Sequence, residues 1–242
     1  MTEDAKNTKR TEKEGRVIRL YHAEVQMLKI GAAALALIAL AMAILYLEYF
    51  RLTPGFGARY GLYMLYIAIS AAVIGIGAWH IKSYRHTFSC SMGMMAGMTI
   101  GMMSGFLLGA IIGATNGMFM GSVYGMFTGM FIGAWITRCC GIMSVMEGLM
   151  AGLMGGLMGA MTTVMMLNDN LAIFMPLLIG SIVTIMIGMS VMIYKESSEH
   201  HGKLPKSDRY EAISYISLLF ILAMLTTFIM VYGPKSALLA VY

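Results

Sequence analysis

Residues 93–133 read GMMAGMTIGMMSGFLLGAIIGATNGMFMGSVYGMFTGMFIG, with glycine at every fourth position. The gaps hold mostly Met, Ala, Ile, Leu and Phe, and the next charged residue is Arg138. In water each helical glycine costs about 1 kcal/mol relative to alanine, so a soluble helix would not carry this load. In lipid, small residues at spacing four let helices associate by close van der Waals contact. The stretch therefore predicts glycine-zipper packing between membrane helices.

This glycine repeat is too long for one membrane helix. At about 1.5 Å per residue it would reach roughly 60 Å, twice the hydrocarbon core. Its polar turn signal is Thr115-Asn116-Gly117, which predicts a tight antiparallel hairpin. Because spacing four exceeds the helical period, the glycine line rotates by about 40° per step. We therefore expect each glycine helix to contact one neighbour at one end and a different neighbour at the other.

Composition places the whole chain among polytopic membrane proteins. Hydrophobic residues make up 59% of the sequence and charged residues only 12%. The predicted fold is an all-α integral membrane helical bundle with about seven transmembrane helices. The apolar segments that are long enough to span are 30–50, 60–81, 90–114, 117–137, 142–167, 171–194 and 213–232.

The basic residues predict the orientation of these spans. With the N-terminus inside, 14 Lys and Arg residues fall on the inner side and three, Arg51, Arg59 and Lys235, on the outer side. Such a positive-inside bias predicts an N-in, C-out topology. We expect a multi-pass protein of a prokaryotic plasma membrane. Its basic residues then serve orientation in the lipid bilayer, and we expect no nucleic-acid partner.

Four regions follow from this reading of the chain. Residues 1–29 form a polar cytoplasmic tail with an interfacial helix at its end. Residues 30–87 form the first transmembrane hairpin, and residues 88–167 form a Gly/Met-rich transmembrane core. Residues 168–242 form a C-terminal transmembrane pair joined by a cytoplasmic loop at 195–212.

Methionine is the main anomaly, with 28 in the chain. Thioethers are soft ligands that favour Cu(I) or Ag(I) over hard ions, so methionine rows at helical spacing are candidate metal ligands. The alternative is that unbranched methionine fills irregular gaps beside glycine. The candidate ligands are Met92, Met94, Met98 and Met102 in the third span and Met146, Met150, Met154 and Met158 in the fifth.

Cysteines add a second candidate ligand group. Cys90 lies at the inner end of the third span, with His86 and Met92 nearby, and Cys139 and Cys140 lie at the inner junction of the fourth and fifth spans. In a reducing compartment these residues stay thiols, and thiolates bind soft ions strongly. The alternative is that they are small buried residues at helix ends.

Glu147 is the acidic residue nearest the glycine-rich spans. Ionisable residues inside membranes are functional candidates, so Glu147 is a metal or proton partner if it faces the bundle. The alternative is that it lies shallow enough to reach water or to pair with Arg138.

These features predict a non-enzymatic membrane protein. The sequence contains no phosphate-binding G-x-x-x-x-G-K-[ST] and no H-E-x-x-H motif. The leading hypothesis is a protein that binds or conducts a soft metal ion such as Cu(I), the one cofactor we expect, through its methionine-rich helices and a cytoplasmic cysteine cluster. One alternative is a glycine-zippered structural protein that assembles as a homo-oligomer or with a membrane partner. Another is a channel for small solutes.

Overall fold

The computed structural model describes residues 56–83, 90–138, 141–200 and 209–234, and every regular element within these ranges is a helix. Within these ranges, five segments are long and apolar enough to cross a membrane: Gly61–Ile81, Ser91–Asn116, Met118–Thr137, Ile142–Asn168 and Leu171–Ile193. The predicted all-helical fold is confirmed for the described residues, with five helices that could span a membrane. The first predicted span, 30–50, lies outside the described residues, so seven spans and the N-in orientation stay predictions. The helices are α2 (Phe56–Ser83), α3 (Cys90–Asn116), α4 (Met118–Thr137), α5 (Ile142–Met165), the short 3-10 helix η4 (Met166–Asn168), α6 (Leu171–His200) and α7 (Arg209–Tyr232).

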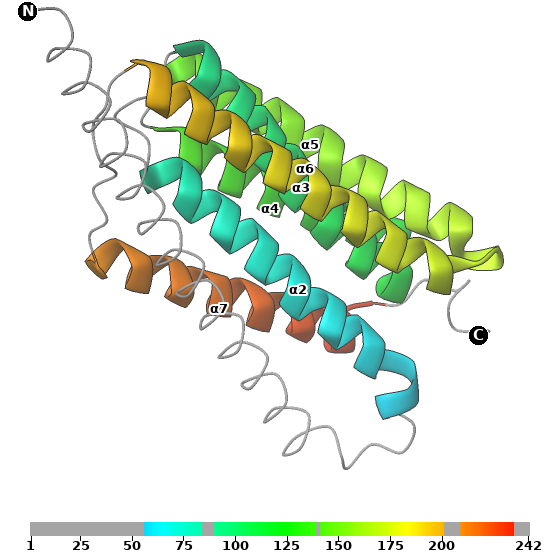
Figure 1. Cartoon of the computed structure of the whole chain (residues 1–242). Coiled ribbons are helices and arrows are strands. Elements are labelled where there is room, and N and C mark those ends of the chain that lie inside the picture. Colours follow the sequence, from blue (N-terminus) through cyan, green and yellow to red (C-terminus); the bar gives the residue numbers. More distant parts are fainter. Residues whose placement is uncertain (1–55, 84–89, 139–140, 201–208, 235–242) are drawn as a thin grey trace, which may run out of the picture.

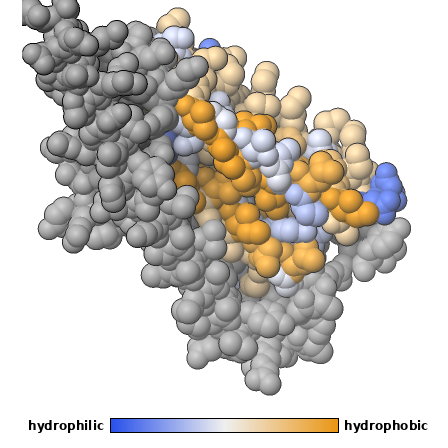
Figure 2. Space-filling view, in the orientation of Figure 1, coloured by the Kyte–Doolittle hydropathy of each residue, from blue (hydrophilic) through white to orange (hydrophobic). Residues whose placement is uncertain are grey.

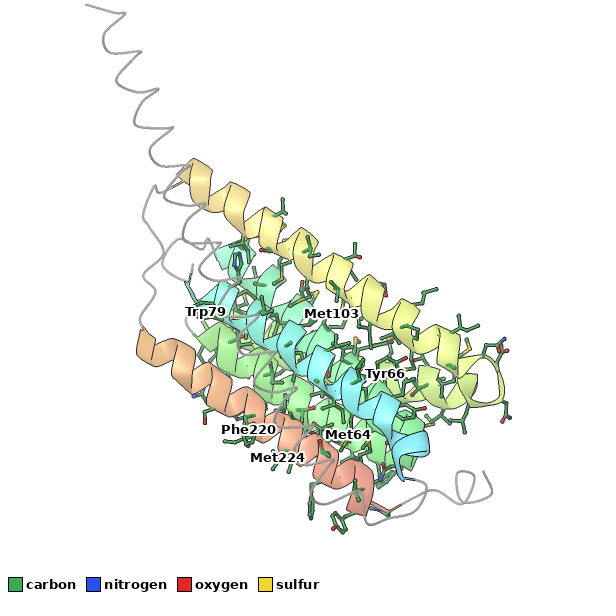
Figure 3. All side chains as sticks on the ribbon, turned by 60° about the horizontal axis from the view of Figure 1, so that its bottom comes forward. Met64, Tyr66, Trp79, Met103, Phe220 and Met224 are labelled. Carbon is green, nitrogen blue, oxygen red and sulfur yellow. The ribbon has the colours of Figure 1, made fainter. Side chains whose placement is uncertain are left out.

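The described helices form two groups that meet at α3. Helices α3, α4 and α5 pack closely against one another, and α2, α6 and α7 lie on one side of them (Figure 1). Within the second group α2 lies between α6 and α7, in both Figure 1 and Figure 3. Among the longer described helices, α5 makes its extensive contacts with α3 and α4, and the short η4 joins its end to α6.

A single residue joins α3 to α4. Gly117 has φ 107°, a left-handed value that L side chains rarely adopt, and this lets the chain reverse at once. Its N–H donates to the carbonyl of Gly113 (3.1 Å), and its carbonyl accepts from the N–H of Gly121 (3.0 Å). The hydrogen-bond ladders of both helices therefore run into Gly117. The break lies where the polar triplet 115–117 predicts it.

The glycines of α3, α4 and α5 meet in layers along one common axis. In the central layer, a Cβ on Gly129 of α4 would lie 2.8 Å from Gly105 Cα of α3 and 2.9 Å from Gly152 O of α5. Similar contacts show that α3 runs antiparallel to α4 and parallel to α5. Backbone atoms fill the axis, so no ion or solute can pass between these three helices. The neighbouring layers are Gly101/Gly133/Gly148, Gly109/Gly125/Gly156 and Gly113/Gly121/Ala160.

The expected change of neighbour along each glycine helix is not what the structure contains. Gly105 lies against both Gly152 of α5 and Gly125 of α4, at one level. The glycine line rotates relative to a straight helix, but helices that wind around one another can keep such a line on their shared axis. Each glycine helix therefore contacts both neighbours along its length.

A second interior, made of ordinary apolar side chains, lies between α3 and the second group. Ile67 of α2, Ile112 of α3 and Met230 of α7 are fully buried there. Figure 3 shows Met103 of α3 between the ribbons of α6 and α2, where it packs against this core. The visible outer surface is mostly apolar, and its strongest hydrophilic colour lies at the end where α5 passes into α6 (Figure 2). This distribution suits a protein surrounded by lipid.

Buried polar side chains fasten α7 to the glycine hairpin. The amide of Asn116 donates to the carbonyl of Ile229 (3.0 Å). The hydroxyl of Thr226 donates to the carbonyl of Leu222 (2.7 Å), so the Tyr124 hydroxyl is the donor in its 2.7 Å bond to Thr226. Such bonds satisfy polar groups that lipid cannot.

The connection between the last two helices is shorter than the predicted loop 195–212. Helix α6 continues to His200, and α7 already begins at Arg209. The polar residues after Tyr194 thus extend the helix beyond its apolar part.

We predict that Gly129→Ala lowers stability by about 1–3 kcal/mol, because the added methyl group overlaps two backbones that cannot move independently. Gly188→Ala is the control, since a Cβ there meets nothing within 4 Å. Thermal unfolding of the detergent-solubilised protein measures both. Equal stability of the two variants would contradict the layered packing.

We predict that Tyr124→Phe lowers the free energy of unfolding by about 0.5–1.5 kcal/mol, because it removes the hydroxyl that donates to Thr226. Tyr232→Phe is the control, because Tyr232 is exposed near the end of α7. Amide hydrogen exchange should show faster exchange in α7 for Tyr124→Phe only. If exchange in α7 is the same in both variants, this bond does not fasten the helix.

Candidate functional site

The candidate site lies on the outside of α3 and α5, where the two helices run side by side. A Cβ on Gly155 of α5 would collide with the backbone of Met102 on α3, and one on Gly159 would collide with the backbone of Phe106. Both contacts advance by four residues along each helix. Helical periodicity then puts Met98 level with Ala151, and Met94 level with Glu147.

Every methionine of α5 is exposed. The glycines of α5 turn toward α3 and α4, and the methionines lie on its exposed side, next to the flank that contacts α3. The four predicted ligands Met146, Met150, Met154 and Met158 are between 53% and 62% exposed. They form a continuous outward row, with one thioether for each turn of the helix.

Three of the α3 methionines, Met94, Met98 and Met102, form a second row beside the first. Met94 and Met102 are half-buried, and Met98 is 47% exposed. By the register above, each lies at a level between two methionines of α5. The two rows together are named the methionine seam. Its three successive sets are Met94/Met146/Met150, Met98/Met150/Met154 and Met102/Met154/Met158.

Part of the seam also serves packing. Met98 and Met102 lie level with Ala151 and Gly155, where the backbones of the two helices approach closely and a flexible thioether suits the uneven surface. The α5 row is different, because all four of its methionines are more than half exposed. Gap filling beside glycine therefore accounts for the α3 row more readily than for the α5 row.

Helix α6 provides a comparison within the same molecule. Its exposed large side chains are mostly branched, whereas Met175 and Met189 are buried, at 2% and 9% exposure. An outward position in this chain can therefore be filled by branched residues, and the methionines of α5 are not explained by exposure alone. The exposed large side chains of α6 are Ile173, Leu177, Ile185, Ile187, Val191 and Met192.

The other predicted ligands are not part of the seam. Met92 is 5% exposed and belongs to the apolar core. Cys90 is the first residue of α3. His86, Cys139 and Cys140 lie outside the described residues, although chain connectivity puts both cysteines between Arg138 and Gly141. Among the described residues, no three His, Cys, Asp or Glu side chains form a group that could hold a metal.

Glu147 is half-buried on the flank of α5 that faces α3. It lies level with Met94, at one end of the seam. A carboxylate in that position would favour a cation at the neighbouring thioethers.

Sequence reasoning missed two features of these helices. The hydrogen bond between Tyr124 and Thr226 joins residues far apart in the chain, and no local sequence pattern predicts it. Ser144 of α5 is fully buried, and its hydroxyl has no hydrogen-bond partner among the described residues. It lies one layer beyond Gly101/Gly133/Gly148, where Gly97 meets both Ser144 and Thr137.

Comparison with known proteins finds no matching family model, no similar curated protein and no similar solved structure.

Proposed function

We propose that this chain is a multi-pass membrane protein that binds a soft monovalent ion, of the Cu(I) type, along the methionine seam and passes it from set to set. The observation that carries the proposal is the register of α3 and α5, in which Met94, Met98 and Met102 each lie at a level between two α5 methionines. Each set draws three thioethers from adjacent turns of the two helices, and thioethers are ligands of the kind that a soft ion prefers.

The chemistry of the seam selects the ion. Thioethers are neutral and polarisable, so they discriminate against Mg²⁺, Ca²⁺ and other ions that prefer oxygen ligands. Successive sets lie about 6 Å apart, the rise of four helical residues. Several similar weak sites in series favour movement, because an ion must leave each site as readily as it enters.

The proposed topology gives the seam a direction. With the N-terminus inside, α3 and α5 both run outward, so the level of Met94 and Glu147 lies toward the cytoplasm. The cytoplasmic cysteines Cys90, Cys139 and Cys140 then serve as the high-affinity acceptor at that end, with His86 beside them. This assignment rests on the positive-inside bias, seven spans and a prokaryotic plasma membrane. No catalytic step is part of the proposal.

A second candidate function is structural, and the glycine layers favour it. Three helices in backbone contact form a rigid platform on which an outward methionine face could dock another membrane protein. The two functions differ in whether the thioethers are needed as ligands.

We predict that changing Met146, Met150, Met154 and Met158 together to Leu weakens Ag(I) or Cu(I) binding by at least about tenfold, because each donor set loses two of its three thioethers. The measurement is anaerobic competition against a chelator, in lipid nanodiscs, with Cys90, Cys139 and Cys140 changed to Ser in every variant so that the cysteines do not contribute. Leucine has similar volume, so the fold is retained.

The matched control changes four exposed methionines that lie on four different elements, Met118, Met166, Met192 and Met224, to Leu. Its affinity should equal that of the protein in which only the three cysteines are changed. An equal loss in both variants, or no binding by the protein with only the cysteine changes, would reject the seam as a metal site and leave the structural function.

A further inference from the structure

Within the part of the chain that the structure describes, the methionine seam is open on its outer side. Helix α5 makes its extensive contacts with α3, α4 and η4, and none of the other described helices covers the α5 row. An ion held by Met98, Met150 and Met154 would have thioethers on one side only. If lipid covered the other side, the ion would face hydrocarbon, which offers no ligand.

An open side is costly for an ion in a membrane. Neutral thioethers leave the full positive charge of Cu(I) in place, and a charge is unfavourable where the dielectric constant is low. A cover over the seam must therefore be apolar enough to lie in the bilayer, and it must offer a further soft donor.

The α5 row is complementary to itself. Two copies inserted with the same topology are related by a two-fold axis along the membrane normal, so their α5 helices run parallel and each level meets the same level of the other copy. A repeat of one side-chain type at spacing four matches itself in that arrangement. No ionisable residue occurs from Gly148 to Asn168, so this pairing buries no like charges.

We infer that a second copy of this chain packs its α5 against the α5 row and closes the seam. The partner's thioethers supply the missing donor at each level, so the conducting unit is a dimer. This inference rests on the proposed function, because it is the bound ion that needs the cover. The outward face of α6, with its branched side chains and Gly188, takes no part in this contact.

The experiment uses the full chain in native membranes. Cys90, Cys139 and Cys140 are changed to Ser, and each variant then carries one introduced cysteine. Met150→Cys and Met154→Cys report on the seam, and Leu177→Cys and Ile185→Cys report on the exposed face of α6. A short bis-maleimide should give a covalent dimer at both seam positions, several-fold above the collisional level at the α6 positions.

Dimer yields at the seam no higher than on α6 would overturn the inference. Intrachain crosslinking in a Met154→Cys/Ala36→Cys variant, without dimer at Met154→Cys, would also overturn it and assign the cover to residues 30–50 of the same chain. Ag(I) titration of the variant in which only Cys90, Cys139 and Cys140 are changed to Ser, in the same membranes, separates the two ideas. If Ag(I) binds but no dimer forms, the dimer inference is rejected and the proposed metal site is retained. If a dimer forms but Ag(I) does not bind, the proposed metal site is rejected.

Discussion

Backbone contact between three helices at shared glycine layers is the constraint on which the rest of this structure depends. A Cβ on Gly105 would lie 2.7 Å from Gly152 O, and one on Gly125 would lie 2.7 Å from Gly109 Cα, so neither position accepts a side chain. Each glycine costs about 1 kcal/mol of helix propensity relative to alanine in water. In the bilayer the helix is retained, because its backbone groups have no other partners. The close approach then gains van der Waals contact along the whole length of the helices.

This contact also decides where the large side chains go. Since glycine occupies the axis, bulky residues of α5 are displaced to its outer side, and the flank toward α3 carries small residues such as Ala151 and Gly155. Met98 and Met102 lie over that flank. Two methionine rows from separate parts of the sequence thereby become neighbours, which is the arrangement that the proposed metal function requires. The proposed metal function follows from the glycine packing as much as from the methionines.

The local features of the fold were predictable from the sequence, because they depend on neighbouring residues. The glycine spacing predicted the membrane helices, and Thr115-Asn116-Gly117 predicted the reversal between α3 and α4. The register between α3 and α5 was not predictable, since α4 separates them and spacing four fits several alignments. The contact of Tyr124 with Thr226 was missed for the same reason. The methionine rows were recognised residue by residue, but their common seam emerged only from tertiary packing.

The most direct test of the seam is X-ray absorption at the metal edge of Cu(I) bound to selenomethionine-labelled protein, because selenium then marks methionine ligands and sulfur marks cysteine ligands. The measurement uses the Cys90→Ser/Cys139→Ser/Cys140→Ser variant, so that copper bound at the cysteines does not contribute. The account predicts selenium in the first coordination shell, and loss of that selenium when Met146, Met150, Met154 and Met158 are all changed to Leu. A first shell of nitrogen and oxygen alone, or a selenium shell that survives those four changes, would contradict it.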